Sequence, residues 1–497
     1  MTYPPPQPSP PPQPAAPPVR PMPVAPALAT DADIQGNVLA AFNKDYELFL
    51  FLQLPASGQC QNFLAALLPL ISTNAEVATF NALFSAARHA GHEDPDDLSA
   101  TWVGFSLTAS GLAKLNPGSS AVLAEPIWDP TVARFTAGAA TAPDVATNGP
   151  EAPASWVFGS PDQTIDAIVT LAADSAEDLV GIAQEIRAIA AVNGVLSVFE
   201  QEGRALPGVR HGHEHFGFKD GISQPGVIGF DEPDPTTPTQ VAGKPGTLLI
   251  EAGEFILGYP GHNNPNGRAV PSWMFDGSFL VVRRLRQDVP GWWAQAEQLS
   301  STLGMPSEQV GAKLVGRWRS GVPVAADPNA DPRSGPDLST DNNFDYGDDL
   351  GGTNTPLCAH IRKVNPRAGT TPGQDTVSEH RILRRGIAFG DPFDPAAGKD
   401  HGPDAQRGLV FACYQASIGQ QFEFLQQIWA DDAGFPTAGA GPDPVIGPAG
   451  AGTIITPAGS ASVSPGRFVQ LQGAVYAFTP SIPTLQLLAT GGVLPTP

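Results

Sequence analysis

The chain contains little cysteine. Cys60, Cys358 and Cys413 are the only cysteines in 497 residues, and no two of them form a CxxC pair. A set this small and odd in number indicates neither a disulfide framework nor a structural zinc site. We therefore expect a reducing compartment.

Positive charge is also scarce. The chain has 27 Lys+Arg against 49 Asp+Glu, which gives a formal net charge of -22. Such a surface repels phosphate backbones and anionic bilayers. We therefore expect neither a nucleic acid nor a membrane as partner.

Long apolar runs are missing too. A transmembrane helix needs about 18 consecutive apolar residues, and no such stretch occurs in this sequence. The start of the chain has no charged segment followed by an apolar one and no twin arginine, so it does not resemble a secretory signal. We predict a cytoplasmic protein.

What the sequence has instead, at its start, is proline. Residues 1–30 are so rich in it that they favour extended polyproline-like states over a hydrogen-bonded core. We predict a disordered leader over 1–30, and the alternative is a docking tail for a partner.

The rest of the chain alternates strand and helix patterns. YELFLFLQL at 46–54 is apolar enough for a buried strand, and helical spacing follows at 60–72 and 75–91. A later helix is predicted to begin at Asp174, with Glu177 completing a capping box, and to end at Asn193-Gly194. The remaining predicted strands lie at 101–109, 166–174, 195–203, 253–259, 278–286 and 407–417, and the remaining predicted helices at 290–304, 307–316 and 420–430.

Strands mixed with helix pairs favour antiparallel sheets with helices on one face. We therefore predict an α+β fold of two ferredoxin-like domains, over 31–225 and 226–497. Two stretches interrupt this pattern: an acidic one at 326–352 and a Gly/Ala/Pro-rich one at 431–466. We expect both to be long surface loops that frame an active-site mouth.

The densest local signal is HGHEHFGFKDGISQP at 211–225. Its glycines and proline fix tight turns around a single acid, Asp220. His211, His213 and His215 alternate, so on a strand they would face one side and could bind zinc or copper. The structural alternatives are a polar loop with one packed histidine and a turn or capping role for Asp220.

Two later segments also carry chemistry. TPLCAHIRKVNPR at 355–367 places His360 among apolar and basic neighbours, and HRILRRGIAFGD at 380–391 delivers Arg384 and Arg385 into a glycine turn. Taken singly, a lone histidine is usually structural, and paired arginines usually form an ion pair or an anion site.

Together these segments resemble the dye-decolorizing peroxidase family, whose GxxDG signature is met by Gly217, Asp220 and Gly221. The resemblance is specific because GFKDGISQP, AHIRKVNPR, ILRRGIAFG and GLVFACYQASIGQQFEF follow one another in order, and it extends from about Asp33 to Pro483. It implies two ferredoxin-like domains, similar to a dimeric α+β barrel, with one haem b per chain held mainly by the second domain.

Residue by residue, the resemblance implies that His360 is the axial ligand of the haem iron, Asp220 the distal acid/base and Arg384 the distal cation. The other implied haem contacts are Gly221, Ile222, Ser223, Gln224 and Arg367. The implied activity is the reduction of hydrogen peroxide through a ferryl intermediate, with oxidation of phenolic compounds and aromatic dyes.

The mechanism needs these residue types. Peroxide must lose a proton from one oxygen and gain one on the other, which requires a side chain that acts as base and then as acid. Asp220 can do this, and its ordinary pKa of about 3.9 predicts an acidic activity optimum. A permanently charged guanidinium, that of Arg384, stabilises the negative charge that grows on the leaving oxygen.

Several assignments stay open at this point. The second ring nitrogen of His360 needs an acceptor, and Glu423 is our candidate. Cys358 is an alternative axial ligand, as a thiolate, and Arg385 is an alternative distal arginine. Two other functions are a haem carrier or storage protein, which would need neither Asp220 nor Arg384, and a metal module built on the three histidines.

The sequence also departs from the family pattern. Thr355 and Pro356 stand where family members often begin the histidine segment with cysteine and proline. Ala388 and Phe389 stand where proline and tyrosine are frequent, which implies a different pocket shape.

Overall fold

The computed structural model describes residues 27–495, apart from 57, 92–94, 96–97, 333–341, 368–376, 395–405 and 457–458. The predicted leader at 1–30 therefore lies outside the described residues, except for its last four. These form a 3₁₀ helix, η1 (Ala27–Thr30), whose Leu28 is buried and donates its backbone N–H to the carbonyl of Gly229 at 2.8 Å. The predicted leader is thus too long by these four residues, because Leu28 packs into the core.

The first half of the chain forms four antiparallel strands with helices between them. The strands are β1 (Tyr46–Gln53), β2 (Thr101–Leu107), β3 (Ala167–Ala173) and β4 (Leu196–Arg204), in the spatial order β4-β1-β3-β2. Helices α1 (Gln59–Leu67) and α2 (Asn74–Gly91) connect β1 to β2, and α6 (Ala176–Val192) connects β3 to β4. This order and these crossovers are those of a ferredoxin-like unit.

Strand β1 is apolar at nearly every position because both of its faces are buried. Leu48, Leu50 and Leu52 belong to the core on one face of the sheet, which the helices cover. Phe49 and Phe51 belong to the core on the other face. The sequence pattern therefore reflects burial on two sides rather than an alternating, half-exposed strand.

Helix α6 begins one residue later than predicted. Its N-cap is Ser175, whose hydroxyl accepts from the backbone N–H of Asp178 at 3.1 Å. Asp174 instead pairs with the ammonium of Lys44 at 2.5 Å, so its carboxylate is not free to cap. The predicted end is confirmed, since Gly194 has a φ of 68° and lies just after the helix.

The second half repeats the arrangement. Its strands are β7 (Ser278–Gln287), β8 (Leu383–Arg384), β9 (Ile387–Phe389), β10 (Gly408–Gln415) and β13 (Val469–Thr479), in the order β13-β7-β10-β8, with β9 also on β10. Helices α7 (Val289–Leu303) and α8 (Ser307–Val315) follow β7, and π-helical turns η8 (Ile418–Phe422) and η9 (Leu425–Ala430) follow β10. The predicted α+β fold with two ferredoxin-like halves is confirmed.

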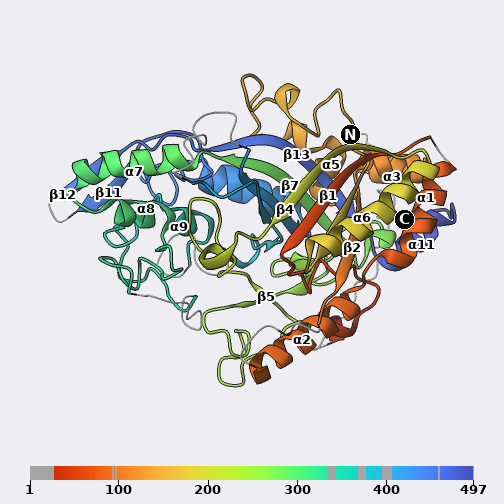
Figure 1. Cartoon of the computed structure of the whole chain (residues 1–497), viewed down its shortest axis with the longest axis horizontal. Coiled ribbons are helices and arrows are strands. Elements are labelled where there is room, and N and C mark those ends of the chain that lie inside the picture. The colour runs from red at the N-terminus through yellow and green to blue at the C-terminus, as the bar shows by residue number, and fades with distance from the viewer. Residues whose placement is uncertain are drawn as a thin grey trace, which may run out of the picture.

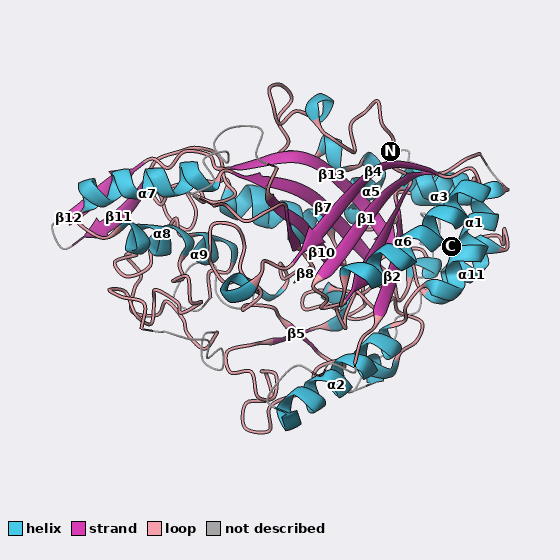
Figure 2. Ribbon diagram, in the orientation of Figure 1, coloured by secondary structure: helices cyan, strands magenta, loops and turns pink. Residues whose placement is uncertain are grey.

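The two halves share one sheet, which runs through the centre of the molecule (Figure 2). Strand β13 joins β2 through the pair Phe478–Leu107. Among the described residues no strand pairing links β4 to β8 or β9, so the sheet is not a closed barrel. The edges still approach closely at Gly203, where a Cβ would lie 2.2 Å from Ile387 Cγ2. The domain boundary at 225/226 stays a prediction.

Helices gather at the two ends of this sheet. In Figure 1, α1, α3 (Ala109–Leu115), α6 and the C-terminal α11 (Ile482–Ala489) lie on the right, whereas α7, α8 and the hairpin β11 (Gly452–Thr456)/β12 (Gly459–Val463) lie on the left. The short helix α9 (His360–Val364) is next to α8. The other elements are α4 (Ser119–Leu123), α5 (Pro130–Ala137), β5 (Gly226–Val227), β6 (Leu249–Ile250), η2 (Leu68–Leu70), η3 (Ala139–Thr141), η4 (Pro153–Ser155), η5 (Gly208–Arg210), η6 (Ala252–Glu254) and η7 (Ser272–Met274).

The two stretches predicted to be surface loops each contain buried residues. The stretch at 431–466 contains the β11/β12 hairpin and the fully buried side chain of Asp443. The described part of 326–352 buries Asn342 and Tyr346. The stretch at 431–466 is therefore not simply a surface loop, whereas the described part of 326–352 is irregular and mostly exposed. That both stretches frame an active-site mouth stays a prediction.

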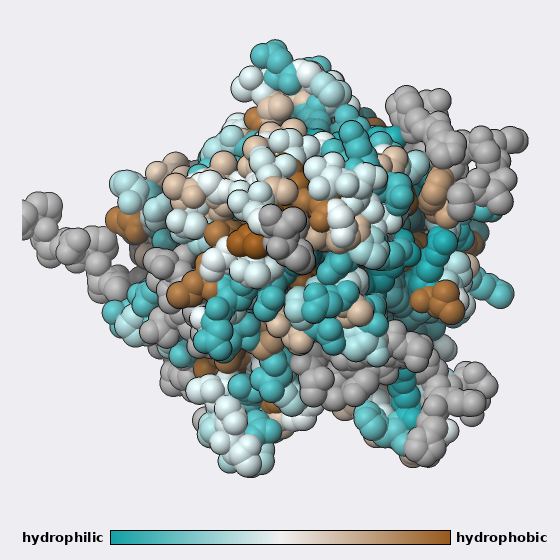
Figure 3. All heavy atoms as spheres, turned by 90° about the vertical axis from the view of Figure 1, so that its left-hand side faces the viewer, coloured by the Kyte–Doolittle hydropathy of each residue, from teal (hydrophilic) through white to brown (hydrophobic). Residues whose placement is uncertain are grey.

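The outer surface carries mixed polarity. On the side shown in Figure 3, hydrophobic residues form small groups among hydrophilic ones. None of the helices in the described part of the chain is long and apolar enough to cross a membrane.

Candidate active site

One cavity, of about 340 Å³, brings together the three segments selected from the sequence. Its wall includes Asp220, His360 at the start of α9, and Arg384 on β8. Of the other predicted contacts, Gly221, Ile222, Ser223 and Arg367 line this cavity, whereas Gln224 and Glu423 do not. Much of the remaining wall is apolar. It includes Leu409 and Phe411 on β10, and Leu425, Val445 and Ile446 on later segments.

Asp220 and Arg384 form an ion pair at this cavity. Asp220 Oδ1 accepts from Arg384 Nη1 at 2.7 Å and from the backbone N–H of Gly221 at 2.6 Å. Burial raises the pKa of Asp220, whereas the Arg384 guanidinium and the Gly221 N–H lower it, and the net effect holds the pKa below its ordinary value. Asp220 is therefore a carboxylate at neutral pH.

Gln224 acts behind this pair. Its side-chain Nε2 donates to the Arg384 carbonyl at 2.7 Å, and its Oε1 accepts from the Arg384 backbone N–H at 3.2 Å. The two bonds fix the backbone of Arg384 to the loop that carries Asp220. Gln224 thus supports the pair without lining its cavity.

Arg385, the alternative distal arginine, points elsewhere. It donates to the backbone carbonyls of Asn37 at 2.9 Å, Val38 at 2.9 Å and Leu39 at 3.0 Å. It does not line the cavity. The alternative assignment is therefore wrong, and Arg385 instead ties the N-terminal segment to β8.

This arrangement predicts a stability effect at Arg385. Arg385→Met leaves several carbonyls without a donor, and we expect a loss of about 3 kcal/mol in the free energy of unfolding. Urea denaturation followed by fluorescence measures it. Arg187→Met, which removes a more exposed ion pair with Glu200, is the control and should cost less than about 1 kcal/mol. Equal effects for the two variants would contradict the assignment.

His360 is held by an aspartate that the sequence reasoning missed. His360 Nδ1 donates to Asp443 Oδ2 at 2.7 Å, and the Asp443 side chain is fully buried. Asp443 Oδ1 accepts from the backbone N–H groups of Val445 at 2.8 Å and Ile446 at 3.1 Å. With Nδ1 engaged in this way, Nε2 is left as the ring atom that can bind a metal.

The prediction that Glu423 accepts from His360 is therefore corrected. The Glu423 carboxylate accepts from Arg134 Nη2 at 2.6 Å and from the hydroxyl of Tyr476 at 2.9 Å. Its partners therefore lie on α5 and β13. A signal for Asp443 did exist, because it is the only acidic residue after Asp432 in an otherwise acidic chain.

Cys358 is not placed to replace His360. Its side chain is buried and it does not line the cavity. Burial raises the pKa of its thiol to about 11, so the thiol is neutral at physiological pH. Cys358 therefore behaves as a small hydrophobic residue.

Three arginines converge on Ser223 at another part of the cavity wall. Arg317 Nη2 donates to Ser223 Oγ at 2.8 Å, Arg381 Nη2 to the Ser223 carbonyl at 3.1 Å, and Arg367 Nη2 to Ser223 Oγ at 3.4 Å. Arg381 has no carboxylate partner among the described residues, and burial together with Arg367 and Arg384 lowers its pKa to about 9. A ligand with carboxylates would relieve this excess of positive charge.

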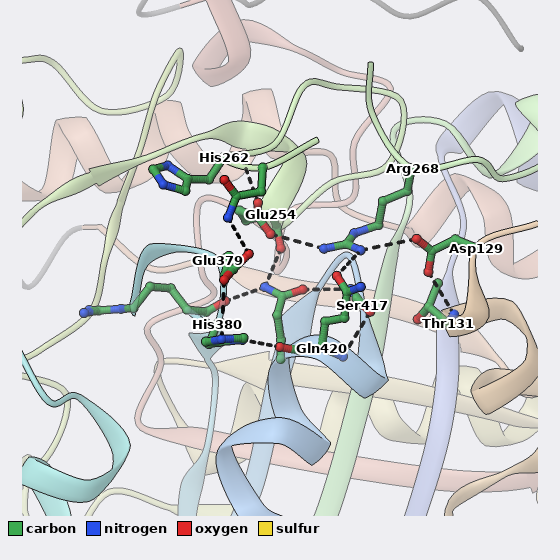
Figure 4. A network of polar contacts seen from close by, with 12 residues as sticks. Asp129, Thr131, Glu254, His262, Arg268, Glu379, His380, Ser417 and Gln420 are labelled. Atoms are coloured by element: carbon green, nitrogen blue, oxygen red, sulfur yellow. Dashed lines mark hydrogen bonds and ion pairs between the residues drawn. The ribbon is translucent and has the colours of Figure 1, made fainter. Parts of the chain in front are cut away.

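A polar network supports this wall (Figure 4). Gln421 Nε2 donates to the carbonyl of Arg381 at 2.5 Å. His380 Nδ1 donates to the carbonyl of Gln420 at 2.5 Å, and both of these residues are labelled in Figure 4. The side chain of Gln420 accepts from Arg268 Nη1 at 2.7 Å, and Arg268 also reaches Asp129 at 3.3 Å. The wall is thereby connected to the first half of the chain.

The three histidines of the 211–225 segment do not converge. His211 Nε2 pairs with Asp45 Oδ1 at 2.8 Å on the surface, whereas the buried His215 donates from Nε2 to the Phe389 carbonyl at 2.8 Å. Within the part of the chain that the structure describes, no group of three or more His, Cys, Asp or Glu side chains is arranged to hold a metal ion. The metal-module hypothesis therefore loses its geometric basis.

Comparison with known proteins agrees with this geometry. Residues 33–207 match the domain family described as DyP dimeric alpha+beta barrel domain, and residues 266–436 match the Dyp-type peroxidase C-terminal family. A dye-decolorizing peroxidase of Auricularia auricula-judae is 34% identical over 492 residues, which cover 92% of this chain and 86% of the relative. A multifunctional dye peroxidase of an Amycolatopsis species is 30% identical and covers 84% of this chain and 85% of the relative.

Solved structures give the same result. An ancestral D-type dye-decolorizing peroxidase is 32% identical, with a TM-score of 0.74 and coverage of 92% of this chain and 98% of that one. A variant of the Pleurotus ostreatus dye-decolorizing peroxidase is 30% identical, with a TM-score of 0.76 and coverage of 93% and 99%. The chain therefore belongs to the dye-decolorizing peroxidase family of haem-dependent peroxidases.

Proposed function

We propose that this chain binds one haem b through His360 and reduces hydrogen peroxide with Asp220 and Arg384, oxidising phenolic compounds and aromatic dyes. One observation carries the proposal. The Asp220–Arg384 ion pair, at 2.7 Å, lines the same cavity as His360, whose ring is held from behind the cavity wall by Asp443, also at 2.7 Å. A haem peroxidase needs both pairs, one for the peroxide and one for the iron.

The residues present fit a haem. His360 supplies a neutral ring nitrogen, and Asp443 makes that ring electron-rich through its hydrogen bond. Apolar side chains suit the faces of the macrocycle, and Arg317, Arg367 and Arg381 suit its two carboxylates. These proposed haem contacts come from the second half of the chain. The predicted contacts at Ser223 and its neighbours come from the first half. When bound, the haem supplies the redox chemistry that cleaves peroxide and oxidises the donor.

The protein's own contribution begins with a proton. Asp220, held as a carboxylate by Arg384, would take a proton from one oxygen of the peroxide and return it to the other, so that this second oxygen can leave as water. Arg384 stabilises the negative charge that develops on that leaving oxygen, because a guanidinium stays protonated. A small phenol can enter the cavity itself, whereas a bulky dye must donate its electron from outside it.

The lowered pKa of Asp220 predicts the pH dependence of the peroxide step. The carboxylate stays ionised as pH falls until the pH passes below the ordinary aspartate pKa of about 3.9, so the rate constant should be level from neutral pH to about pH 4 and fall below it. Stopped-flow absorption from pH 3 to pH 7 measures this. A fall centred above pH 5 would contradict the role of Arg384 in holding Asp220 ionised.

Haem titration tests the proposal as a whole. The chain should bind one equivalent of haem with the Soret band of histidine-ligated iron, and the loaded protein should oxidise a phenol and an aromatic dye only when peroxide is present. His360→Ala should lose this Soret band. A loaded protein whose spectrum is indifferent to peroxide would instead indicate a haem carrier.

A further inference from the structure

A carboxylate that the proposed mechanism does not use borders the same cavity as Asp220 and Arg384. It belongs to Glu214. Its Oε1 accepts from the backbone N–H of Phe218 at 2.9 Å, and its Oε2 accepts from the backbone N–H of Phe216 at 2.9 Å and from Gln287 Nε2 at 2.5 Å. Three N–H donors thus converge on one carboxylate.

These bonds close the hairpin that carries Asp220. The Asp220 N–H donates to the Gly212 carbonyl at 3.0 Å, the Glu214 N–H to the Phe218 carbonyl at 3.1 Å, and the Gly217 N–H to the Glu214 carbonyl at 2.9 Å. The Glu214 side chain folds back into the turn of its own hairpin. Without it, the Phe216 and Phe218 N–H groups would lose their acceptor.

Both sides of the hairpin are anchored. Gln287, the last residue of β7, connects Glu214 to the central sheet. On the other side Phe216 stacks on Trp292 with ring centroids 4.7 Å apart, and Trp293 Nε1 donates to the Phe216 carbonyl at 3.0 Å. The aromatic contacts hold the outer part of the turn, and the carboxylate holds its inner part.

Resting on the proposed function, we infer that Glu214 is the positioning residue of Asp220, since it fixes the hairpin 212–220 so that Asp220 meets Arg384. A second carboxylate this close to Asp220 is unfavourable: burial raises the pKa of Glu214 to about 7, and the charge of Asp220 adds to the increase. The three N–H donors lower the pKa again and offset part of this cost. Only an ionised carboxylate can accept from all three N–H donors at once. This explains why a carboxylate stands at this position despite the repulsion from Asp220.

Glu214→Gln tests the inference first without activity. The amide keeps the shape of the side chain but turns one acceptor into a donor that faces N–H groups. Hydrogen–deuterium exchange of haem-free and haem-loaded protein should show amides in 212–221 exchanging about tenfold faster than in wild type. Glu297→Gln, on the exposed side of α7, is the matched control and should leave these amides unchanged.

The peroxide step supplies the second readout. In Glu214→Gln the second-order rate constant for peroxide should fall about ten- to a hundredfold, because a small misplacement of Asp220 costs this much, while the KM for a phenol should not change. Gln287→Leu, which removes a single donor, should act in the same direction with a smaller effect, and it serves if Glu214→Gln does not fold.

These variants distinguish a failure of the positioning role of Glu214 from a failure of the proposed function. A Glu214→Gln rate within twofold of wild type, while Asp220→Asn is slow, would overturn the positioning role and leave the proposed function in place. A slow Glu214→Gln with unchanged exchange in 212–221 would also overturn it. Wild type and Asp220→Asn reacting equally fast would instead refute the proposed function.

Discussion

Replacing Asp220 with Asn should lower the second-order rate constant for hydrogen peroxide by about 10²- to 10⁴-fold, the usual contribution of a general acid–base group. The amide keeps the size of the side chain and can still approach Arg384, but it cannot take the proton from peroxide. Stopped-flow absorption of the haem-loaded variant measures the loss. Haem binding should stay normal, because the proposed iron ligand is His360 and Asp220 is not one of the residues that hold His360.

The control for this prediction is Asp45→Asn. Asp45 is exposed and pairs with His211, in contact with the segment that carries Asp220 but away from the cavity. Its rate constant should equal that of wild type. If Asp220→Asn reacted as fast as Asp45→Asn, a group other than Asp220 would have to transfer the peroxide proton.

Replacing Asp443 with Asn should weaken haem binding about ten- to a hundredfold, as loss of a carboxylate behind a histidine ligand does. Asp443 is the fully buried acceptor of His360 Nδ1, so in the proposed haem site its charge would make the ring a stronger donor to ferric iron. If the loss falls mainly on ferric haem, the reduction potential should rise by about 60–120 mV, at 59 mV per tenfold for a one-electron couple. Spectroelectrochemistry of the loaded protein measures the shift.

Glu423→Gln is the matched control for Asp443→Asn. Glu423 is also a buried carboxylate, but it pairs with Arg134 and Tyr476. Its replacement should lower the melting temperature, since Arg134 loses its charged partner, and leave the potential unchanged. A shift in Glu423→Gln without one in Asp443→Asn would indicate that Glu423, and not Asp443, controls the His360 ring.

Glu423 and Asp443 illustrate which features of the site can be predicted from sequence and which cannot. Segments with a strong hydrophobic period were predictable, namely the buried strand β1 and the two similar α+β halves, because burial acts on neighbouring residues. Asp220, His360 and Arg384 were indicated by the resemblance of their three segments to a known family, since each of them taken singly has a structural interpretation.

Partners that are distant in sequence were not predictable in the same way. Asp443 lies 83 residues after His360, in a stretch without periodicity, and nothing in its neighbours indicates that its carboxylate is buried. Glu423 lies in a segment whose helical pattern is clear, but that pattern does not show which residue the carboxylate contacts. Likewise, Arg384 and Arg385 are adjacent, and only the strand pairing of β8 decides which of them faces the cavity.

The most direct test of the central claim is a double-mutant cycle on the peroxide step. Rate constants are measured by stopped-flow absorption for the haem-loaded wild type, Asp220→Asn, Arg384→Leu and the variant with both changes. We predict a rapid change of the haem spectrum in the wild type, slow changes in both single variants, and a double variant that is little slower than Asp220→Asn, because the two residues act as one unit. A wild-type spectrum indifferent to peroxide, or losses that simply multiply in the double variant, would contradict the account.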